Sequence, residues 1–482
     1  MIADLKPYPA YQDPGVPWLG EVPAHWALPR LGAVLRERGE TNDDGRITDV
    51  LSVMKDRGVI PYAEKGNVGN KKSEDITRYN IVRPDDIVVN CMNVIIGSVG
   101  LSRYSGCLSP VYYVLTRRSQ TDDPRYLNAY FQTKPFQLSL VRIGNGILAH
   151  RMRIPMELLK CEPFPIPPTD EQAAIVRYLD HADRRIRRHI RVKQKLVKLL
   201  EEQKQAIIHR AVTRGLDPNV RFKPSGVAWM GDVPVHWLVA RLKDAADVQT
   251  GLTLGKNYKG VMTESHPYLR VANVQVGRVD LRQVKRIDVP RHEASGATLR
   301  AGDVLMTEGG DIDKLGRGCV WHDEIPGCLH QNHVFAVRCR QQLLAPEYLV
   351  GLMASQHGRN YFQLTAKQTT NLASTNSTTL RAFPIMLPPL AEQKVILDEI
   401  SRQSIGLDAA IDRAQREISL LREYRTRLTA DVVTGKLDVR ELAANLPDIS
   451  DEPETLDDTE APAEGDEPAD GELDSVPEEA EA

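Results

Sequence analysis

Residues 14–31 read PGVPWLGEVPAHWALPRL, and residues 225–242 read SGVAWMGDVPVHWLVARL. Ten of the eighteen positions are identical, and the two copies hold four of the five tryptophans in the 482-residue chain. Self-similarity at a fixed spacing is typical of a duplicated architecture. The repeat therefore predicts that the chain contains one unit built twice. We refer to the two copies as the tryptophan segments.

A second repeat closes each half. FPIPPTDEQ at 164–172 matches FPIMLPPLAEQ at 383–393, and from Pro167 and Pro388 onward the spacing stays at 221 residues as far as AVTRGLD (211–217) and DVVTGKLD (431–438). Between these landmarks the halves have diverged. Each half is therefore predicted to consist of a tryptophan segment, a divergent body and a shared closing segment.

The closing segments are predicted to be long helices, 169–214 and 390–436. Thr169 with Gln172 fits a capping box, Glu171 suits the positive end of the helix dipole, and Gly215 can close the far end. At 1.5 Å per residue, a helix of about 44 residues is roughly 66 Å long. Apolar side chains recur at the three-and-four spacing of a coiled-coil seam. The predicted seam residues are Ile175, Leu179, Ile186, Ile190, Leu200, Ile207, Ile396, Ile400, Leu407, Ile411, Leu421 and Leu428.

Two helices with matched seams are expected to pack against each other. Chain connectivity then makes them antiparallel, places the two bodies at opposite ends about a pseudo-twofold axis, and brings the N- and C-terminal conserved segments together. The rival arrangement has each helix paired with a helix of another subunit. We expect the pairing within one chain.

The tryptophan segments stand where the ends of the helices are expected. Trp18, Trp26, Trp229 and Trp237 are suited to anchoring loops against helix ends. His25 and His236 accompany them, but no second histidine, cysteine or carboxylate pair lies at metal-ligand spacing. The sequence predicts buried or capping histidines and no metal site.

The formal net charge of −3 conceals two different parts. Residues 441–482 hold 17 acidic side chains and no lysine or arginine, so the preceding 440 residues carry 62 basic against 48 acidic side chains, or +14. The Pro-rich acidic tail is predicted to be disordered. A basic body suggests a polyanionic partner, although basic side chains also serve solubility.

Several classes of protein are disfavoured by what the sequence lacks. No apolar run is long enough to span a bilayer, no signal peptide is recognisable, and the six cysteines are scattered, so we expect a cytoplasmic protein. TGLTLGKN has three residues between its glycines and Asn after the Lys, so it is not a Walker A loop. No other catalytic motif stands out, and we expect no catalytic centre, metal or cofactor on this chain.

The bodies read as mixed α/β modules. Strands are predicted at 86–90, 111–117, 303–308 and 333–339, and GCL at 106–108 returns at 327–329. Two modules of one fold with different loops suit a split, asymmetric DNA site, whose half-sites a rigid spacer would hold apart. The predicted fold class is α+β, with domains at 1–168 and 215–389, helices at 169–214 and 390–436, and the tail at 441–482.

Polar and basic clusters in each body are the candidate DNA contacts, since Lys and Arg suit phosphates or guanine and Asn and Gln suit adenine. Any single one of these side chains is better explained as an ordinary exposed group, and the clusters are stronger candidates than their individual members. A basic stretch, RRIRRHIRVKQK at 184–195, could lie near phosphates, face solvent or bind a partner protein. The candidate residues are Lys55, Arg57, Lys65, Asn67, Asn70, Lys71, Lys72, Lys256, Asn257, Tyr258, Lys259, Lys367, Gln368, Thr369 and Asn371.

The order of WLGEVPAHW, FPIPPTDEQ, WMGDVPVHW, FPIMLPPLAEQ and TGKLD resembles that of the specificity subunit (HsdS) of type I restriction-modification systems over about residues 10–440. The resemblance implies two target recognition domains that each read half of a bipartite double-stranded DNA target. It also implies helices that bind two methyltransferase subunits, with restriction subunits joining them. S-adenosylmethionine, ATP and Mg²⁺ would belong to those partners. TGLTLGKNYKG departs from the Gly-Gly-Thr-Pro-Ser-like stretch common in relatives, which leaves its DNA contacts open.

Two other classes of function remain as alternatives from the sequence. The chain could be a self-sufficient DNA modification or cleavage enzyme, which turnover without added subunits would reveal. It could also be a coiled-coil scaffold that never binds DNA, which salt-dependent binding to DNA would exclude.

Overall fold

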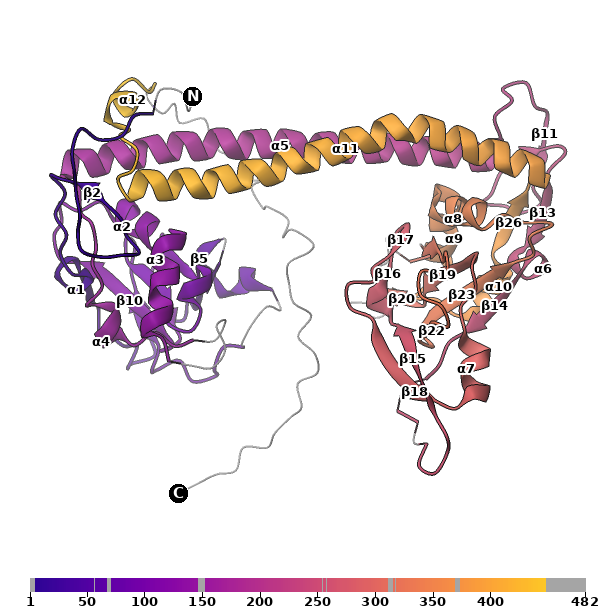
Figure 1. Cartoon of the computed structure of the whole chain (residues 1–482), viewed down its shortest axis with the longest axis horizontal. Helices are drawn as coiled ribbons and strands as arrows, with labels where there is room; N and C mark the ends of the chain where they lie inside the picture. Colours follow the sequence, from indigo (N-terminus) through magenta and orange to yellow (C-terminus); the bar gives the residue numbers. More distant parts are fainter. Residues whose placement is uncertain are drawn as a thin grey trace. The chain divides into compact units, whose positions relative to one another are not determined.

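The structure is a computed structural model that describes residues 5–55, 57–66, 71–145, 152–253, 255–256, 258–310, 315–316, 318–368 and 373–447 (Figure 1). The chain folds into two compact units. Unit 1 comprises residues 1–183 and 426–482, and unit 2 comprises residues 184–425. Both limits fall inside the long helices, so each unit holds one body together with parts of both helices. The predicted pseudo-twofold arrangement of the bodies stays a prediction.

Unit 1 is built on a four-stranded antiparallel sheet in the order β3-β10-β7-β8. The two predicted strands are its central pair, and their buried valines Val88 and Val114 face each other across the ladder. β-Branched residues favour such a buried, pleated position. The strands are β3 (Leu35–Glu37), β10 (Tyr112–Arg117), β7 (Ile87–Asn90) and β8 (Val99–Leu101).

Unit 2 repeats this sheet in the order β14-β23-β19-β21, again antiparallel throughout. The predicted strands at 303–308 and 333–339 are its central pair, so all four predicted strands are confirmed. The same strand order about 220 residues later is what the duplicated landmarks predict. The strands are β14 (Ala246–Thr250), β23 (Val334–Cys339), β19 (Asp303–Thr307) and β21 (Gly318–Val320).

Smaller strands and helices complete each unit. Unit 1 adds β1 (Tyr11–Gln12) with β2 (Val22–Pro23), β4 (Leu51–Met54) with β5 (Gly58–Pro61), β6 (Asn80–Val82) with β9 (Gly106–Leu108), and helices α1 (Leu31–Val34), α2 (Pro124–Phe131), α3 (Lys134–Ser139) and α4 (Met156–Leu159). Unit 2 adds β11 (Phe222–Pro224) with β12 (Asp232–Pro234), β13 (Leu238–Arg241) with β26 (Pro384–Leu387), β15 (Glu264–Leu269) with β18 (Lys285–Val289) and β22 (Leu329–His330), β16 (Val274–Gln275) with β17 (Arg278–Val279), and β20 (Gly309–Gly310), β25 (Ala373–Ser374) and β24 (Lys367–Gln368). Its short helices are α6 (Leu242–Ala245), α7 (Arg291–Ala297), α8 (Pro346–Ala354), α9 (Gln356–Thr365) and α10 (Ser377–Ala382).

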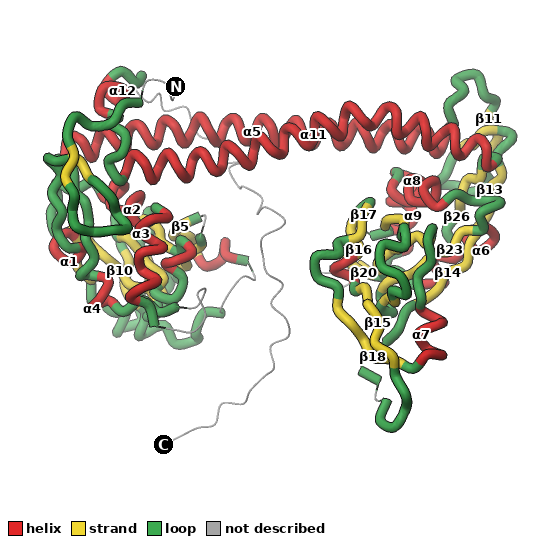
Figure 2. Tube along the Cα trace, viewed as in Figure 1, coloured by secondary structure: helices red, strands yellow, loops and turns green. Residues whose placement is uncertain are grey.

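The closing segments form the two long helices α5 (Thr169–Arg214) and α11 (Leu390–Val433), drawn in red in Figure 2. Within unit 2 they lie side by side. Lys193 Nζ is 2.6 Å from Glu417 Oε2, and Lys204 Nζ is 2.6 Å from Asp408 Oδ1. The α11 partner moves toward the N-terminus as α5 advances, so the helices run antiparallel in this unit and pair within one chain. Their apolar contact includes Ile186, Ile190, Ile418, Leu421 and Tyr424.

All twelve predicted seam residues are buried or half-buried. Ser404, rather than its neighbour Gln403, is the buried residue of that turn of α11, and its hydroxyl has no recorded hydrogen-bond partner. A polar group of this kind within an apolar seam costs stability but can fix the register of two helices.

The beginnings of the long helices differ from the expectation in one respect. The predicted capping box of Thr169 with Gln172 is wrong, because Thr169 is already helical and the side chain of Gln172 reaches elsewhere. Its Oε1 accepts from the backbone N–H of Asp123, the residue before α2, at 2.8 Å, and its Nε2 donates to the Pro167 carbonyl. In unit 2, Gln393 makes the same pair of contacts with Ala345 and Pro388. The Glu-Gln pair thus joins each helix to its body.

The far ends follow the sequence more closely. Gly215 and Gly435 take φ of +72° and +80°, which glycine adopts readily. α11 ends at Val433, three residues before the predicted limit, because the chain turns at Gly435 and the Lys436 backbone N–H donates back to the Asp431 carbonyl at 2.8 Å.

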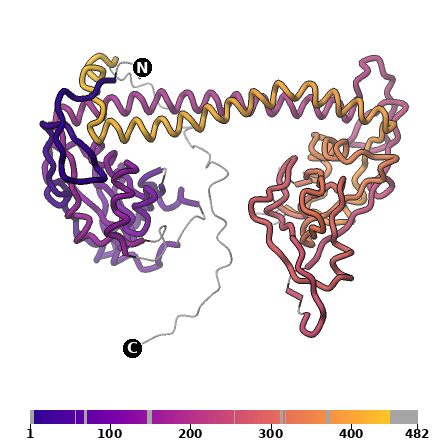
Figure 3. The backbone as a smooth tube through the Cα atoms, viewed as in Figure 1, coloured from indigo at the N-terminus to yellow at the C-terminus, as the bar shows by residue number. Residues whose placement is uncertain are grey.

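Unit 1 also joins the N- and C-terminal conserved segments, as expected (Figure 3). Lys6 pairs with Asp438 as an isolated bridge, and the Arg440 guanidinium lies 5.1 Å from the centre of the Tyr8 ring. Residues 441–447 differ from the predicted disordered tail, because α12 (Arg440–Ala444) buries Ala443 and the Arg177 side chain donates to the Leu446 carbonyl at 2.7 Å. The rest of the predicted tail, 448–482, lies outside the described residues.

Candidate nucleic-acid interface

Each tryptophan segment fastens a body to the ends of both long helices. In unit 1, Glu171 in the first turn of α5 accepts from Tyr8 Oη at 2.5 Å and Trp26 Nε1 at 2.7 Å, with His25 Nε2 2.8 Å away. The Trp26 ring also lies against Gly435 at the end of α11, where a Cβ would come within 3.1 Å of the ring. The predicted role of the tryptophans as anchors at helix ends is confirmed at this position.

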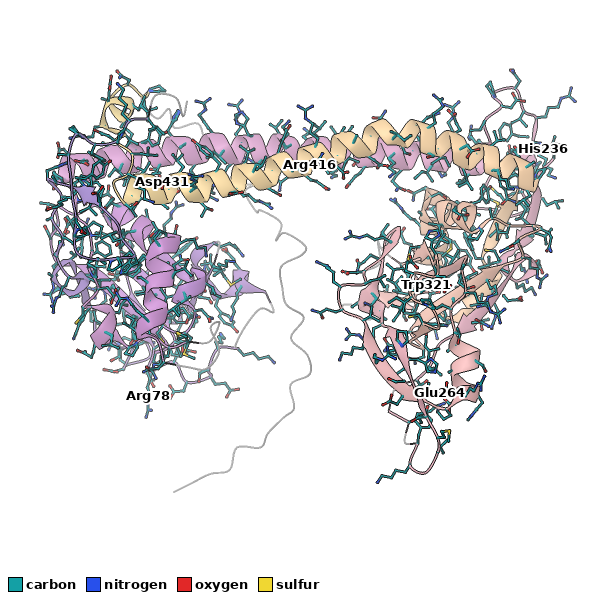
Figure 4. All side chains as sticks on the ribbon, in the orientation of Figure 1. Arg78, His236, Glu264, Trp321, Arg416 and Asp431 are labelled. Carbon is teal, nitrogen blue, oxygen red and sulfur yellow. The ribbon has the colours of Figure 1, made fainter. Side chains whose placement is uncertain are left out.

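Unit 2 makes the corresponding contacts with the helices exchanged. Glu392 in the first turn of α11 accepts from Trp237 Nε1 at 3.0 Å, and the Trp237 ring lies against Gly215 at the end of α5. Glu392 also lies 2.8 Å from Nε2 of His236, the residue labelled in Figure 4. The repeated tryptophan and glutamate therefore form a joint that is present once in each unit. Among the described residues, no group of three or more potential ligands is placed to hold a metal ion.

A buried arginine–aspartate pair fixes the same corner of each sheet. Arg38 binds both oxygens of Asp86 at 2.8 and 2.7 Å, and Arg338 binds both oxygens of Asp303 at 2.8 and 2.7 Å. The two aspartates, 1% exposed, stand at corresponding strand starts. The arginines differ, since Arg38 follows β3 and Arg338 belongs to β23. The two sheets thus share the same backbone arrangement, but the arginine that binds the aspartate comes from a different strand in each.

At the other end of the central strands of the unit 2 sheet, away from Asp303, loops that are far apart in the sequence come together. After β19, the Glu308 N–H donates to the His333 carbonyl at 2.9 Å and its carbonyl accepts from Thr375 N–H at 2.8 Å. Leu252 pairs with Gln331, and the Asn332 N–H donates to the Leu252 carbonyl at 2.9 Å. We define the unit 2 rim as Glu308, Gln331, Asn332, His333 and Ser374.

Unit 1 has a corresponding edge. Cys91 follows β7 as Glu308 follows β19, and its carbonyl accepts from the Ile154 N–H at 2.9 Å, 221 residues before Thr375. Asn145 and Arg153 pair as an isolated bridge, in the place where β24 and β25 meet in unit 2. We define the unit 1 rim as Cys91, Val111, Tyr113, Asn145 and Arg153.

The two rims present different chemistry on this common frame. In unit 2, His333 Nδ1 lies 2.6 Å from Glu308 Oε2, and their side chains are 55% and 31% exposed. In unit 1, the place of Glu308 is taken by the buried thiol of Cys91, and the place of His333 by the exposed Val111. Burial raises the pKa of both Cys91 and Tyr113, and the nearby Arg153 guanidinium opposes that rise. The unit 1 rim thus offers a cation and the unit 2 rim a carboxylate with a histidine.

The first predicted cluster lies on the β4–β5 hairpin and the 3₁₀ turn that follows it, η1 (Tyr62–Lys65). The Tyr62 ring has the amines of Lys65 and Lys72 at 5.1 and 5.9 Å from its centre. Arg57 is held by Glu64, with its guanidinium 3.2 Å from the carboxylate. Lys55 and Lys71 are exposed, while Asn67 and Asn70 lie outside the described residues.

The second predicted cluster is tied to α7. Lys256 Nζ lies 2.8 Å and Tyr258 Oη 3.1 Å from Glu293 Oε2, and the Lys256 amine holds the pKa of Glu293 below its usual value. The charge of Lys256 is therefore largely compensated. In the third cluster, Lys367 is exposed on β24, opposite Ser374 of the unit 2 rim. Asn257, Thr369, Asn371 and the side chain of Gln368 lie outside the described residues, and Lys259 is exposed.

The basic stretch 184–195 divides between two faces of α5. Ile186 and Ile190 face α11, and Lys193 pairs with Glu417, while Arg188 and Lys195 are exposed. Val192, Leu196 and Leu199 are also exposed, by 62%, 40% and 52%, at the spacing that places them on one face of the helix. An exposed apolar stripe with basic neighbours is a feature of protein-docking surfaces.

Sequence reasoning missed the rim residues themselves. Glu308, His333 and Arg153 come from three separate segments, and no local motif joins them. One pattern could have identified the position: after the strand starts DIVVN and DVLMT, the duplicated halves carry Cys91 in one copy and Glu308 in the other. Where the two copies carry side chains of different polarity at the same strand end, the loops that follow are expected to differ in function.

Burial raises the pKa of Cys319, Cys328 and Cys339 to about 12, so these cysteines are neutral thiols at pH 7. No helix in the described ranges is both long enough and apolar enough to cross a membrane.

The duplicated antiparallel sheets, the joints and the two long helices define a two-unit α+β protein. The chain is 22% identical over 431 residues to the type I restriction enzyme MjaVIII specificity subunit of Methanocaldococcus jannaschii, covering 87% of this chain and 95% of that protein. It is 23% identical over 291 residues to the type I restriction enzyme EcoKI specificity subunit of Escherichia coli K12, covering 59% of this chain and 60% of that one. A 25% identical match to MjaX of M. jannaschii, whose name assigns it to the same class provisionally, spans 42% of this chain and about half (47%) of that relative.

A chain of the solved structure "Structural basis underlying complex assembly and conformational transition of the type I R-M system" shares the fold, with a TM-score of 0.59 and 18% identity over 86% of this chain and 99% of that one. No protein-family model matches the chain. The resemblance predicted from the tryptophan and closing segments is confirmed: this chain is a relative of the type I restriction enzyme specificity subunits.

Proposed function

We propose that this chain is the DNA sequence-recognition subunit of a type I restriction-modification complex. Each body reads one half of a bipartite double-stranded target, and the paired helices set the spacing between the halves. The observation that carries the proposal is the pair of rims, which have one backbone frame and different functional groups. Two copies of one reader with unlike side chains are what an asymmetric, two-part DNA sequence requires.

Charge supports a DNA partner. The 440 residues before the acidic tail carry a net +14, and both bodies carry exposed lysines such as Lys55, Lys71 and Lys367. Phosphate contacts by such side chains supply affinity and make it depend on salt, while polar groups at the rims supply discrimination between bases.

The long helices support the second part of the proposal. Their antiparallel pairing in unit 2 makes a stiff element, and stiffness is what a fixed spacer needs. The exposed stripe of Val192, Leu196 and Leu199 offers an apolar face for a partner helix, and we assign it to the docking of methyltransferase subunits. We infer that two such subunits bind, since the joints between helix and body occur twice.

Catalysis would then belong to the partners. S-adenosylmethionine on the methyltransferase subunits and ATP with Mg²⁺ on restriction subunits would supply the chemistry, in the cytoplasm, and this chain would contribute sequence recognition alone. Neutral, buried thiols agree with that assignment.

The test is the sequence bound by the complex of this chain with its methyltransferase subunits. Bound fragments from a randomised double-stranded DNA library are sequenced, and the same selection is repeated after residues 30–165 are exchanged for the corresponding body of a related subunit. We expect two short conserved stretches separated by a fixed unspecified spacer, of which the exchange alters one. Binding is expected to weaken steeply with salt.

Three outcomes would contradict the proposal. Selection of no sequence would remove the recognition role, and methylation or cleavage of DNA by the purified chain alone would make it an enzyme. If the exchange altered both stretches, the two bodies would not be independent readers.

A further inference from the structure

The unit 2 rim places a carboxylate where a DNA-binding surface is expected. Glu308 is part of the rim by its backbone, which binds both His333 and Thr375, so its side chain starts from a fixed point. A carboxylate is repelled by phosphates and would weaken non-specific binding to DNA. Its presence on such a surface is useful only where it meets a hydrogen-bond donor.

Among base edges in the major groove, the donors are the exocyclic amines of cytosine and adenine. Adenine suits the amide of Asn or Gln, which donates to N7 while it accepts from the N6 amine. An ionised carboxylate can only accept, and the N4 amine of cytosine is the donor it fits best. The chemistry of Glu308 therefore selects one base.

His333 gives the carboxylate a defined direction. Its Nδ1 is 2.6 Å from Glu308 Oε2, and its Nε2 is 3.5 Å from the Asn332 side-chain amide. One oxygen of Glu308 is thereby engaged, which leaves the second oxygen to accept from a ligand.

We infer that Glu308 is a specificity-determining residue that accepts a hydrogen bond from the N4 amine of a cytosine in the half-site read by unit 2, with His333 as its positioning residue. This inference rests on the proposed function and names one base contact within it. The unit 1 rim has no counterpart of this pair, since Cys91 and Val111 occupy the two positions, so the contact belongs to one half of the target only.

The experiment is the fragment selection described above, made with the full chain in its methyltransferase complex and with the variants Glu308→Gln and His333→Gln. Exchange of residues 30–165 identifies the half-site that unit 2 reads. The wild type is expected to require a G·C pair at one position of that half-site. Glu308→Gln should reduce the preference at this position at least tenfold and leave every other position unchanged, because the substitution removes the charge and replaces one acceptor oxygen by a donating amine of equal size.

His333→Gln should weaken the same preference without moving it to another position. Glu324→Gln is the matched control. Glu324 is an exposed carboxylate that accepts from the backbone N–H of His322 at 3.0 Å. It lies near the opposite end of β19, because the backbone N–H of the neighbouring Trp321 donates to the carbonyl of Asp303, the first residue of that strand. It should leave the selected sequence unchanged. A merely structural role for Glu308 would lower the melting temperature or the affinity for all sequences together.

The possible outcomes distinguish failure of the Glu308 contact from failure of the proposed DNA-recognition function. An unchanged bipartite sequence with Glu308→Gln, from a variant that melts as the wild type does, overturns the inference and leaves the recognition role intact. Glu308→Ala, which removes the acceptor altogether, provides a second reading should the glutamine variant be unstable, and it too must lose the preference. If the wild type selects no sequence, the proposed function and the inference both fail.

Discussion

Glu171 and Glu392 occupy the same position in the two closing segments, yet their surroundings differ. Glu171 is 2% exposed and receives bonds from Tyr8 and Trp26, with His25 and, at 3.9 Å, Arg440 beside it, whereas Glu392 is 30% exposed and meets Trp237 and His236. Burial raises the pKa of Tyr8, so its hydroxyl stays protonated and donates. The first joint is therefore a buried polar network and the second a half-exposed one.

Glu171→Gln should consequently cost more stability than Glu392→Gln. Removing the charged acceptor in unit 1 leaves buried donors poorly paired, at about 3 kcal/mol, against about 1 kcal/mol where water can replace the lost bond. Urea unfolding of the two variants, followed by tryptophan fluorescence, measures the difference. Equal losses would mean that the contacts of Tyr8 and Arg440 contribute nothing.

Arg153 is the exposed cation of the unit 1 rim, and Arg suits the O6 and N7 acceptors of guanine. Arg153→Gln should relax a guanine preference in the half-site that unit 1 reads by roughly tenfold and leave the other half-site alone, as fragment selection would reveal. Arg103→Gln is the control, because Arg103 is exposed next to Ser102, whose N–H binds Asp86 at the other end of β7. Loss of affinity for all sequences alike would reassign Arg153 to a phosphate contact.

At the scale of elements, α9 carries a histidine that its counterpart α3 lacks. His357 is buried, stacks on Trp229 with ring centres 4.8 Å apart, and donates from Nε2 to the Pro384 carbonyl at 2.8 Å. Its counterpart in unit 1 is Pro135, which cannot titrate. Burial lowers the pKa of His357 to about 4, with nearby His209 adding to the effect.

Unit 2 should therefore lose stability on acidification in a way that unit 1 does not. The unfolded chain takes up a proton near pH 6.5, whereas the folded chain resists it until about pH 4, so the stabilisation present above pH 6.5 declines as the pH falls towards 4. At pH 5 the loss is about 2 kcal/mol. Hydrogen exchange of the α9 amides at pH 7 and pH 5 measures the loss. Burial also lowers the pKa of His330 and His209 in this unit, so His357→Gln, which keeps a donor, should remove only the part of the pH dependence that comes from His357. An equal dependence in the variant would count against His357 as a cause.

The long helices are also open to a length test. Deleting residues 201–207 from α5 and 404–410 from α11 removes one heptad from each and keeps the seam in phase. The spacer between the two half-sites should shorten by about 10 Å, or three base pairs, while both half-site sequences persist. Fragment selection gives the spacer directly. A deletion in α11 alone serves as the control and should abolish selective binding, and an unchanged spacer in the double deletion would show that the helices are not the ruler.

These elements differ in how far the sequence could foretell them. The long helices and the central strands follow from local periodicity: α5 begins and ends at its predicted residues, since Pro168 and Gly215 bound it. The role of Gln172 could not be found that way, because its partner Asp123 is 49 residues away in the sequence. The rims were missed for the same reason, since they assemble from segments whose pairing depends on the whole sheet.

The whole molecule combines a basic body with an acidic end, and the structure decides where the two can be separated. Residues 441–447 are anchored in unit 1 through Ala443 and the bond from Arg177 to Leu446, so truncation before Glu441 would damage the body. The acidic residues after Pro447 number 16, with no basic residue among them. Their removal changes the formal charge from −3 to +13 without touching a described contact.

Deleting residues 448–482 should leave the selected DNA sequence unchanged, because the rims that read bases are intact. Affinity for unrelated DNA at low salt should not fall and is expected to rise severalfold, since 16 negative charges that repel phosphates are gone. Titrations of the full and shortened chains, each in its methyltransferase complex, against specific and scrambled duplexes at 50 and 200 mM salt measure both effects. A tail with its acidic residues replaced by Asn and Gln distinguishes charge from length. A changed sequence preference, or weaker binding after the deletion, would mean that the tail takes part in recognition.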